Sequence, residues 1–99
     1  MFTAIPTRRF ADWIEGLKDR RAAAKVAIRI ARLEAGNFGD AKGVGDRVSE
    51  LRIAYGPGYR VYFTVRGEDV VILLVGGDKG SQRRDIALAK EMAKEIHGA

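Results

Sequence analysis

The sequence contains no cysteine and one histidine, His97, among its 99 residues. Without cysteine, the chain cannot form a disulfide, a thiolate zinc site or a cysteine nucleophile. A single histidine also excludes a histidine metal site within one chain and a histidine pair that acts as acid and base. Gly76-Gly77 lacks the spacing of a phosphate-binding loop or a dinucleotide-binding fingerprint. We therefore expect neither a metal ion nor a nucleotide cofactor.

Long apolar runs are absent as well. The longest, Val70 to Val75, has the length of a strand and not of a membrane span. The N-terminus lacks the charged segment and apolar stretch of a secretory signal. With 46% hydrophobic residues, a chain of 99 residues can form one folded domain, residues 1–99. The sequence thus predicts a single cytoplasmic domain without a membrane segment.

Charge is unbalanced towards lysine and arginine, with 18 of these residues against 13 aspartates and glutamates and a net charge of +5. Most of the excess lies in the N-terminal half, on Arg8, Arg9, Arg20, Arg21, Lys25, Arg29 and Arg32. Such a surface favours a polyanion, because neutralised phosphates release their counterions. A solvated helical face would carry the same charges, so the charge narrows the class of partner without identifying it.

Hydrophobic spacing predicts two helices after a short edge strand at Met1–Ile5. The first helix begins near Thr7, because apolar residues recur at the spacing of one helical face: Phe10, Trp13, Ile14 and Leu17. Asp19 is placed to cap a second helix that runs to about Ala35. The inner face of this helix carries Val26, Ile30 and Leu33.

The remaining sequence predicts a loop, three strands and a last helix. Gly36–Asp46 holds four glycines and almost no large apolar residue, which is typical of a mobile loop. Strands are expected near Arg47–Ala54, Tyr59–Arg66 and Asp69–Val75, with Pro57-Gly58 at the centre of the first turn. Asp78–Gly80 forms a loop, and Ser81 caps a helix whose inner face carries Ile86, Ala89, Ala93 and Ile96. The order β-αα-βββ-α predicts an α+β domain in which helices cover one sheet face and leave the other open.

Strand alternation gathers polar side chains on the sheet face that the helices are expected to leave open. The apolar face carries Leu51, Ile53, Tyr59, Val61, Phe63 and Val65. The opposite face carries Glu50, Arg52, Arg60, Tyr62 and Thr64. A face with two arginines, a carboxylate and a tyrosine is suited to binding a phosphate diester.

Arg60 is the first candidate for chemistry. A guanidinium group can hold a phosphate with two hydrogen bonds and stays charged at all working pH values. Arg52, on the neighbouring strand and the same face, would be repelled by Arg60 unless an anion or a carboxylate lay between them. Glu50 offers that carboxylate, so a structural ion pair and a phosphate site both remain open. Tyr62 could stack on a base or form a hydrogen bond with the phosphate.

Several segments resemble the RelE/HigB superfamily of toxin proteins, and within it the small addiction module killer protein branch. The matching segments are Glu50-Leu51-Arg52-Ile53, Gly58-Tyr59-Arg60-Val61-Tyr62-Phe63, Gly76-Gly77-Asp78-Lys79 and Gln82…Asp85-Ile86…Ala89. Phe10-x-x-Trp13-Ile14 and the segment from Arg29 to Asp40 fit the same branch. The resemblance covers nearly the whole chain and implies the RelE fold, whose order of elements agrees with the pattern above.

The resemblance also implies roles for further residues. Lys79 stands at the position where RelE-type toxins carry a basic catalytic residue, which neutralises charge on the phosphate or the leaving oxygen. Glu50 stands where the RelE enzyme has a lysine, and it could be a general base for a ribose 2′-hydroxyl or a structural ion-pair partner. Asp85 stands where that enzyme has a tyrosine, which implies a substrate-binding position. Apart from the resemblance, Lys42 in the glycine-rich segment could reach backbone phosphates or be a solvated loop lysine.

The resemblance implies that the chain is the toxin of a type II toxin–antitoxin pair. Its implied activity is that of an mRNA interferase, a metal-independent endoribonuclease that inhibits translation. The 2′-hydroxyl would attack its own 3′ phosphate in the ribosomal A site, while Arg52, Arg60 and Lys79 stabilise the transition state. The implied partners are a helix-turn-helix antitoxin, the ribosome and mRNA, with operator DNA bound only through the antitoxin complex. Three alternatives stay open: a gyrase inhibitor of the ParE type, a degenerate toxin that only binds its antitoxin, and a free-standing RNA-binding module.

Overall fold

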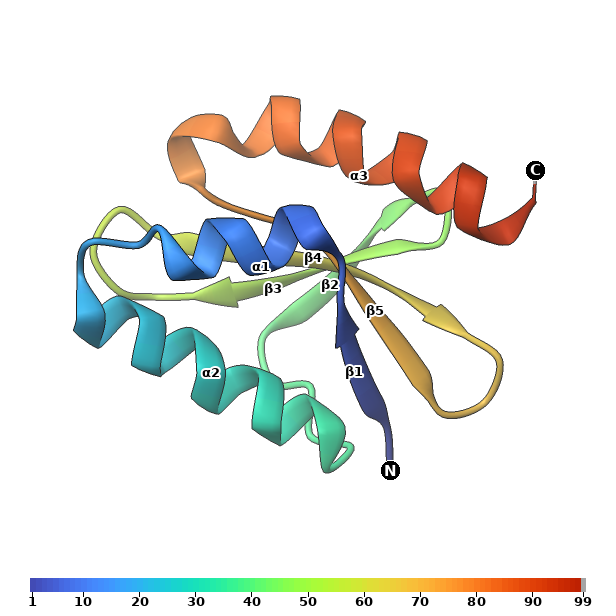
Figure 1. The fold of residues 1–99 in the computed structure, drawn as a ribbon, viewed down its shortest axis with the longest axis horizontal. Helices are drawn as coiled ribbons and strands as arrows, with labels where there is room; N and C mark the ends of the chain where they lie inside the picture. The colour runs from blue at the N-terminus through green and yellow to red at the C-terminus, as the bar shows by residue number, and fades with distance from the viewer. Residues whose placement is uncertain (99) are drawn as a thin grey trace.

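In the computed structural model, which describes residues 1–98, three helices pack on one five-stranded sheet (Figure 1). The strands are β1 (Thr3–Pro6), β2 (Ala41–Gly45), β3 (Val48–Ile53), β4 (Tyr59–Arg66) and β5 (Val70–Asp78). The helices are α1 (Arg8–Glu15), α2 (Arg20–Glu34) and α3 (Gln82–His97), and a turn of 3-10 helix, η1 (Lys79–Ser81), joins β5 to α3. The predicted α+β class is confirmed, with a first strand, two helices, a run of strands and a last helix.

The sheet has the strand order β1-β5-β4-β3-β2, so β1 and β2 are its edges. β1 runs parallel to β5, whereas the other neighbouring strands are antiparallel. β1 pairs with β5 only from Thr3, opposite Val70, to Pro6, opposite Leu73. An edge position suits Pro6, because proline cannot donate a ladder hydrogen bond. The predicted edge strand is therefore present, and it leaves the last five residues of β5 beyond its reach.

The glycine-rich segment that was predicted to be a mobile loop contains a strand, so that prediction is wrong. β2 pairs antiparallel with β3 and places Lys42 opposite Glu50. Backbone hydrogen bonds build this strand without large side chains, which is why a pattern of apolar residues did not indicate it. Before it, the guanidinium group of Arg29 on α2 donates hydrogen bonds to the carbonyl oxygens of Phe38 and Asp40.

Polar side chains cap the helices, in part as expected. The Thr7 hydroxyl accepts a hydrogen bond from the amide of Phe10, and Asp19 caps α2 as predicted. Ser81 does not cap α3 with its side chain, contrary to the prediction. The Asp78 carboxylate instead accepts hydrogen bonds from the amides of Gly80 and Ser81 in η1, so the side-chain cap lies one turn earlier.

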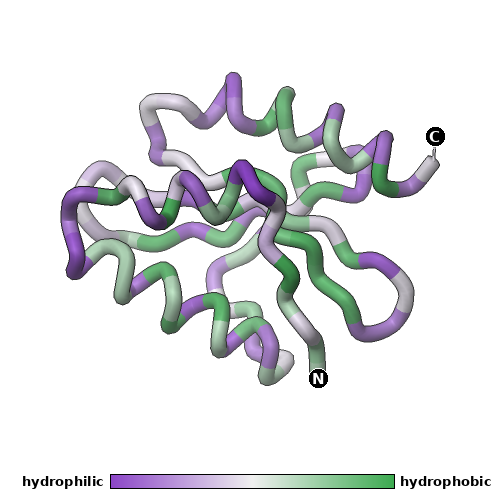
Figure 2. The backbone as a smooth tube through the Cα atoms, in the orientation of Figure 1, coloured by the Kyte–Doolittle hydropathy of each residue, from purple (hydrophilic) through white to green (hydrophobic). Residues whose placement is uncertain are grey.

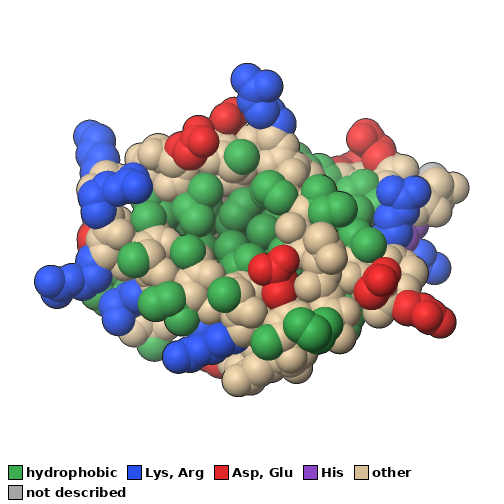
Figure 3. Space-filling view, turned by 60° about the horizontal axis from the view of Figure 1, so that its bottom comes forward, with side chains coloured by type: hydrophobic (Ala, Val, Ile, Leu, Met, Phe, Trp, Pro, Cys, Tyr) green, Lys and Arg blue, Asp and Glu red, His purple; other side chains and the backbone are tan. Residues whose placement is uncertain are grey.

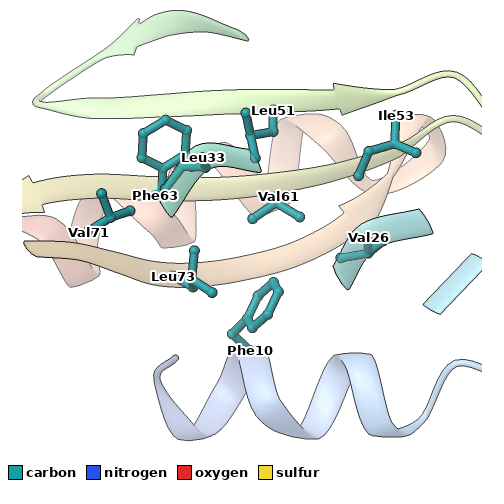
Figure 4. Packing of buried hydrophobic residues seen from close by; sticks show 9 residues of the cluster. All are labelled: Phe10, Val26, Leu33, Leu51, Ile53, Val61, Phe63, Val71 and Leu73. Carbon is teal, nitrogen blue, oxygen red and sulfur yellow. The ribbon is translucent and has the colours of Figure 1, made fainter. Parts of the chain in front are cut away.

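A first apolar layer lies between the sheet and the helices α1 and α2. Nine buried side chains form its centre, all labelled in Figure 4: Phe10, Val26, Leu33, Leu51, Ile53, Val61, Phe63, Val71 and Leu73. Four of them, Leu51, Ile53, Val61 and Phe63, belong to the sheet face that alternation predicted to be apolar. Hydrophobic and hydrophilic segments alternate along α2 and α3 (Figure 2), as expected for helices with one buried face.

A second apolar layer covers the opposite sheet face, which was predicted to be open. It joins Val48, Tyr62, Leu74 and Val75 of the sheet to Ala89 and Ala93 of α3. The prediction was wrong because it placed all the helices on one sheet face, whereas α3 packs on the other. A β-bulge in β5 adds to the apolar surface there: Tyr62 pairs with Val75 and Phe63 with Leu73, so Leu74 has no partner in register. Leu74 and Val75 consequently both pack in the second layer and give α3 an apolar surface to cover.

Apolar side chains also gather in the middle of the face drawn in Figure 3. A groove of about 300 Å³ between α1 and α2 is lined mostly by apolar residues, among them Ala11, Ile14, Ala27 and Ile30.

None of the helices within residues 1–98 combines the length and the apolar character that crossing a membrane requires.

Two adjacent glycines in β5 allow the close packing of both layers. A Cβ atom on Gly76 would lie 2.0 Å from Cε3 of Trp13, and one on Gly77 would lie 1.9 Å from Oδ2 of Asp85. We expect Gly76→Ala to lower the free energy of unfolding by about 1–3 kcal/mol, because the Trp13 ring would have to move. Urea denaturation measures this change.

Gly43→Ala is the matched control. It adds the same methyl group to a strand glycine that has no atom within 4 Å of the new position. We expect the free energy of unfolding of this surface variant to differ from that of the parent by less than about 0.5 kcal/mol. Equal losses of stability in the two variants would contradict the close contact between Gly76 and Trp13.

Candidate functional site

The turn between β3 and β4 lies beside the candidate arginines. The amide of Gly58 donates a 3.0 Å hydrogen bond to the carbonyl oxygen of Tyr55, so Gly56 and Pro57 are the central residues. The predicted centre, Pro57-Gly58, is therefore wrong by one residue. Gly56 has a positive φ of 55°, a conformation that glycine adopts readily at the first central position of a hairpin turn.

Arg52 and Arg60 lie directly opposite each other in the antiparallel pair of β3 and β4. Side chains at such positions have Cβ atoms about 4.5–5.5 Å apart, so the two positive charges repel each other. The Arg52 side chain is 36% exposed, whereas the Arg60 side chain is only 11% exposed. The two arginines meet as alternation predicted, and a negative charge is needed to balance them.

The carboxylate of Glu50 supplies this negative charge. It is completely buried, and its Oε1 accepts a 2.9 Å hydrogen bond from Nε of Arg52. Its Oε2 accepts a second 2.9 Å bond, from Nε2 of Gln82 on α3, and lies 3.8 Å from Nε of Arg60. Burial raises the pKa of Glu50, but the hydrogen bonds from Arg52 and Gln82 outweigh burial and hold this pKa below its usual value of 4.5. Glu50 is therefore ionised at neutral pH.

Arg60 is also held by the turn. One of its terminal nitrogens donates a 2.7 Å hydrogen bond to the carbonyl oxygen of Gly58. A Cβ atom on Gly58 would lie 3.1 Å from Nη1 of Arg60 and 3.7 Å from Cβ of Lys79. The turn thus brings Lys79, an exposed residue of η1, close to Arg60. Three predicted phosphate-binding residues, Arg52, Arg60 and Lys79, meet at this end of the sheet, and we call them the cationic cluster.

Glu50 and Tyr62 cannot contact a substrate directly, which contradicts the predicted roles of general base and base-stacking ring. Both side chains are fully buried, Tyr62 in the layer under α3 and Glu50 behind Gln82. A general base needs a carboxylate that a ribose can reach, and stacking needs an exposed ring. Burial, followed by the negative charge of Glu50, raises the pKa of Tyr62, so its hydroxyl group stays protonated.

Lys42 and Asp85, the other two predicted substrate-binding residues, border the cluster on opposite sides. Lys42 is exposed on β2, one strand beyond Glu50. Asp85 is 6% exposed and lies against Gly77, the residue opposite Arg60 on β5. Because Asp85 accepts a hydrogen bond from the Ser81 hydroxyl and is nearly buried, it supports the start of α3 and presents little surface to a ligand.

The role of Gln82 was missed in the sequence. Gln82 belongs to a segment that resembles the toxin superfamily, but its amide reaches Glu50, which lies 32 residues earlier in the chain. No periodicity indicates such a contact, because it depends on where α3 begins relative to β3. Among residues 1–98, no three histidine, aspartate or glutamate side chains lie close enough together to hold a metal ion.

The lowered pKa of Glu50 predicts a pH-dependent stability. A carboxyl group with a folded-state pKa below 4.5 stabilises the fold above that pH, and the contribution is lost as the pH falls through the folded-state pKa. We expect Glu50→Gln to melt at a lower temperature than the parent at neutral pH, and the difference to shrink in acid. Melting curves followed by circular dichroism measure it.

Glu68→Gln is the control for that series, because Glu68 is exposed in the turn between β4 and β5. It removes the same charge from a carboxyl group without an ion pair among residues 1–98. We expect its melting temperature to follow the parent at each pH. A loss in Glu50→Gln that did not change with pH would show that ionisation of Glu50 is not what stabilises the fold.

Comparison with known proteins places the chain in a family. Residues 12–94 match the family described as Phage derived protein Gp49-like (DUF891), and this range includes every residue of the cationic cluster. An uncharacterized protein of Haemophilus influenzae is 51% identical over 90 residues, which are 91% of each sequence. The chain therefore belongs to the Phage derived protein Gp49-like family, a family of toxin-like proteins of toxin–antitoxin systems.

Proposed function

We propose that this chain is the toxin of a type II toxin–antitoxin pair and that it cleaves mRNA in the ribosomal A site. The observation that carries the proposal is the cationic cluster, in which Arg52 and Arg60 share one buried carboxylate beside the exposed Lys79. Glu50 balances one of the two arginines that it contacts, which leaves positive charge that suits a phosphate diester. Membership of a toxin-like family supports the same class of function.

In the proposed reaction, the 2′-hydroxyl of a ribose attacks the adjacent 3′ phosphate. The new O2′–P bond forms as the bond from phosphorus to the 5′ oxygen of the next nucleotide breaks. The proton of the hydroxyl group passes to solvent, and the leaving oxygen takes one up. Negative charge grows on the phosphate oxygens, where Arg52 and Arg60 stabilise it. It also grows on the leaving oxygen, where Lys79 stabilises it.

Glu50 serves this reaction as a positioning residue. Its contact with Arg52 uses only Nε of that arginine, which leaves the terminal nitrogens of Arg52 for a phosphate. Arg60 likewise commits one terminal nitrogen to Gly58 and keeps the other. Fixed guanidinium groups stabilise a transition state more effectively than mobile ones, because they need little reorganisation during the reaction.

Two groups that could act as a general base, Glu50 and His97, do not reach a substrate at the cluster. Glu50 is buried, and His97 forms a 2.9 Å hydrogen bond with Thr64 near the opposite end of β4. Such a site can stabilise charge but does little to align the attacking hydroxyl with the phosphate. Alignment contributes up to roughly 7–11 kcal/mol to catalysis, and in our proposal the ribosome provides it by holding the codon in a bent conformation.

A helix-turn-helix antitoxin is the proposed partner that keeps the toxin inactive. An acidic segment of such a protein would be attracted to the cationic cluster and would compete with the phosphate of the substrate. Operator DNA would then be bound by the complex through the antitoxin.

Arg60→Ala and Lys79→Ala test the reaction. Losing one donor to the transition state commonly lowers the rate on the order of a hundred- to a thousandfold, so both variants should lose most mRNA cleavage and permit growth when expressed without antitoxin. Lys79 is exposed, so its variant should melt with the parent. Growth curves, cleavage rates and melting temperatures measure the effects.

Arg66→Ala is the matched control for these variants. Arg66 is an exposed arginine six residues further along β4, about 20 Å from Arg60 at the usual rise of a strand. It should arrest growth as the parent does. If Arg60→Ala and Lys79→Ala folded normally and also arrested growth fully, the cationic cluster would not be the active site.

The second test compares one mRNA in two states. We expect strong cleavage when the mRNA is bound to ribosomes with an open A site and weak cleavage when it is naked, because the chain lacks its own means of alignment. Mapping of 5′ ends locates and quantifies the cuts in both states. Equal rates would indicate a free-standing ribonuclease, whereas no cleavage together with inhibited DNA supercoiling would indicate a gyrase inhibitor.

A further inference from the structure

A hollow of about 770 Å³ opens at the edge of β5 between α1 and α3. It is floored by Val75 and Gly76, which lie past the point where β1 stops pairing with β5. The two helices that form its walls pack on opposite faces of the sheet. The hollow therefore occupies the sheet edge itself, and it begins next to Gly77, the residue opposite Arg60.

Three arginines line the hollow, Arg8 and Arg9 from α1 and Arg84 from α3. The side chains of Arg8 and Arg84 are 92% and 82% exposed, and Arg9 is exposed without an ion pair among residues 1–98. Arg8 lies 3.5 Å from a carboxylate oxygen of Asp12, and Arg84 lies 3.9 Å from one of Asp85. The exposed pair of Arg8 and Asp12 contributes little, so an incoming phosphate can replace it. Asp85 is nearly buried, but the exposed Arg84 side chain lies at the long end of ion-pair distance from it and keeps its other nitrogens for a phosphate.

The α1 wall of the hollow also offers an aromatic surface. Trp13 lines it and stays partly exposed, while its ring packs against Gly76. Leu88 of α3 adds apolar surface on the other wall. Proteins that bind single-stranded nucleic acid combine these two features, cations along the backbone and an aromatic ring beneath a base.

We propose that the hollow binds the phosphate backbone of RNA next to the cationic cluster, with Arg9 and Arg84 contacting phosphates from its two walls. The inference rests on the proposed function, because it takes RNA to be what the cluster acts on. β5 and η1 connect the two places: Gly76 and Lys79 are three residues apart, roughly 10 Å along a strand. One RNA strand can therefore occupy both.

Equilibrium binding tests the proposal without cleavage. The probe is a short, labelled single-stranded RNA with 2′-O-methyl groups, in which the attacking hydroxyl is blocked. Each phosphate contact contributes about 0.7 to the slope of log affinity against log salt concentration for a single strand, so Arg9→Ala and Arg84→Ala should each reduce the slope by about this amount. Arg66→Ala removes the same charge far from the hollow and should leave the slope unchanged.

A second arm uses ribosomes with an empty A site in place of the short RNA. A reduced slope with the short RNA assigns the hollow to the substrate strand, and a reduced slope with ribosomes alone assigns it to ribosomal RNA; both support the proposal. Parental slopes in both arms overturn it, even if the protein cleaves mRNA. The proposal is also overturned if Arg9→Ala and Arg84→Ala bind RNA as the parent does but bind an acidic antitoxin more weakly. Reduced slopes in a protein that cuts no RNA would leave the binding site in place and overturn the proposed reaction instead.

Discussion

Glu50 is buried with its negative charge, and the geometry of the candidate site depends on the groups that compensate this charge. A carboxylate removed from water is strongly unfavourable unless hydrogen bonds and opposite charges replace its hydration. Arg52 and Gln82 donate those hydrogen bonds, and Arg60 adds a nearby positive charge. Because the donors come from a strand and a helix, the same interaction fixes the two arginines and the start of α3. In the proposed function, the same atoms make this structural contact and position the two arginines for a phosphate.

The sheet carries apolar layers on both faces, so polar side chains of the strands stay accessible mainly at its rim. The bulge at Leu74 adds apolar surface beneath α3, while Gly76 and Gly77 let Trp13 and Asp85 approach the backbone of β5 closely. With both faces covered, polar chemistry is left to the ends and edges of strands. The cationic cluster lies where β3, β4 and β5 end or turn, and the arginine-lined hollow lies where β1 no longer reaches β5.

Local patterns in the sequence predicted a large part of this structure. The spacing of Phe10, Trp13 and Ile14 indicated α1, and Asp19 caps α2 because a short carboxylate suits that position whatever surrounds it. Alternation along β3 and β4 placed Arg52 and Arg60 on one face, since successive side chains of any strand point to opposite sides. The missed strand, β2, has no such pattern: its glycines are held by backbone hydrogen bonds to β3, which every residue type except proline can make.

The sequence by itself thus determined most of the elements and, away from the bulge in β5, the direction in which each side chain leaves its strand or helix. Tertiary structure decided which of those side chains remain accessible. Tyr62 and Glu50 lie on the predicted face, but α3 buries the first and Gln82 shields the second, so neither can perform the role that an open face would have allowed. The physical reason is the separation along the chain of the residues that interact. Periodicity follows from the geometry of neighbouring residues, whereas burial depends on where a helix from the far end of the chain comes to rest.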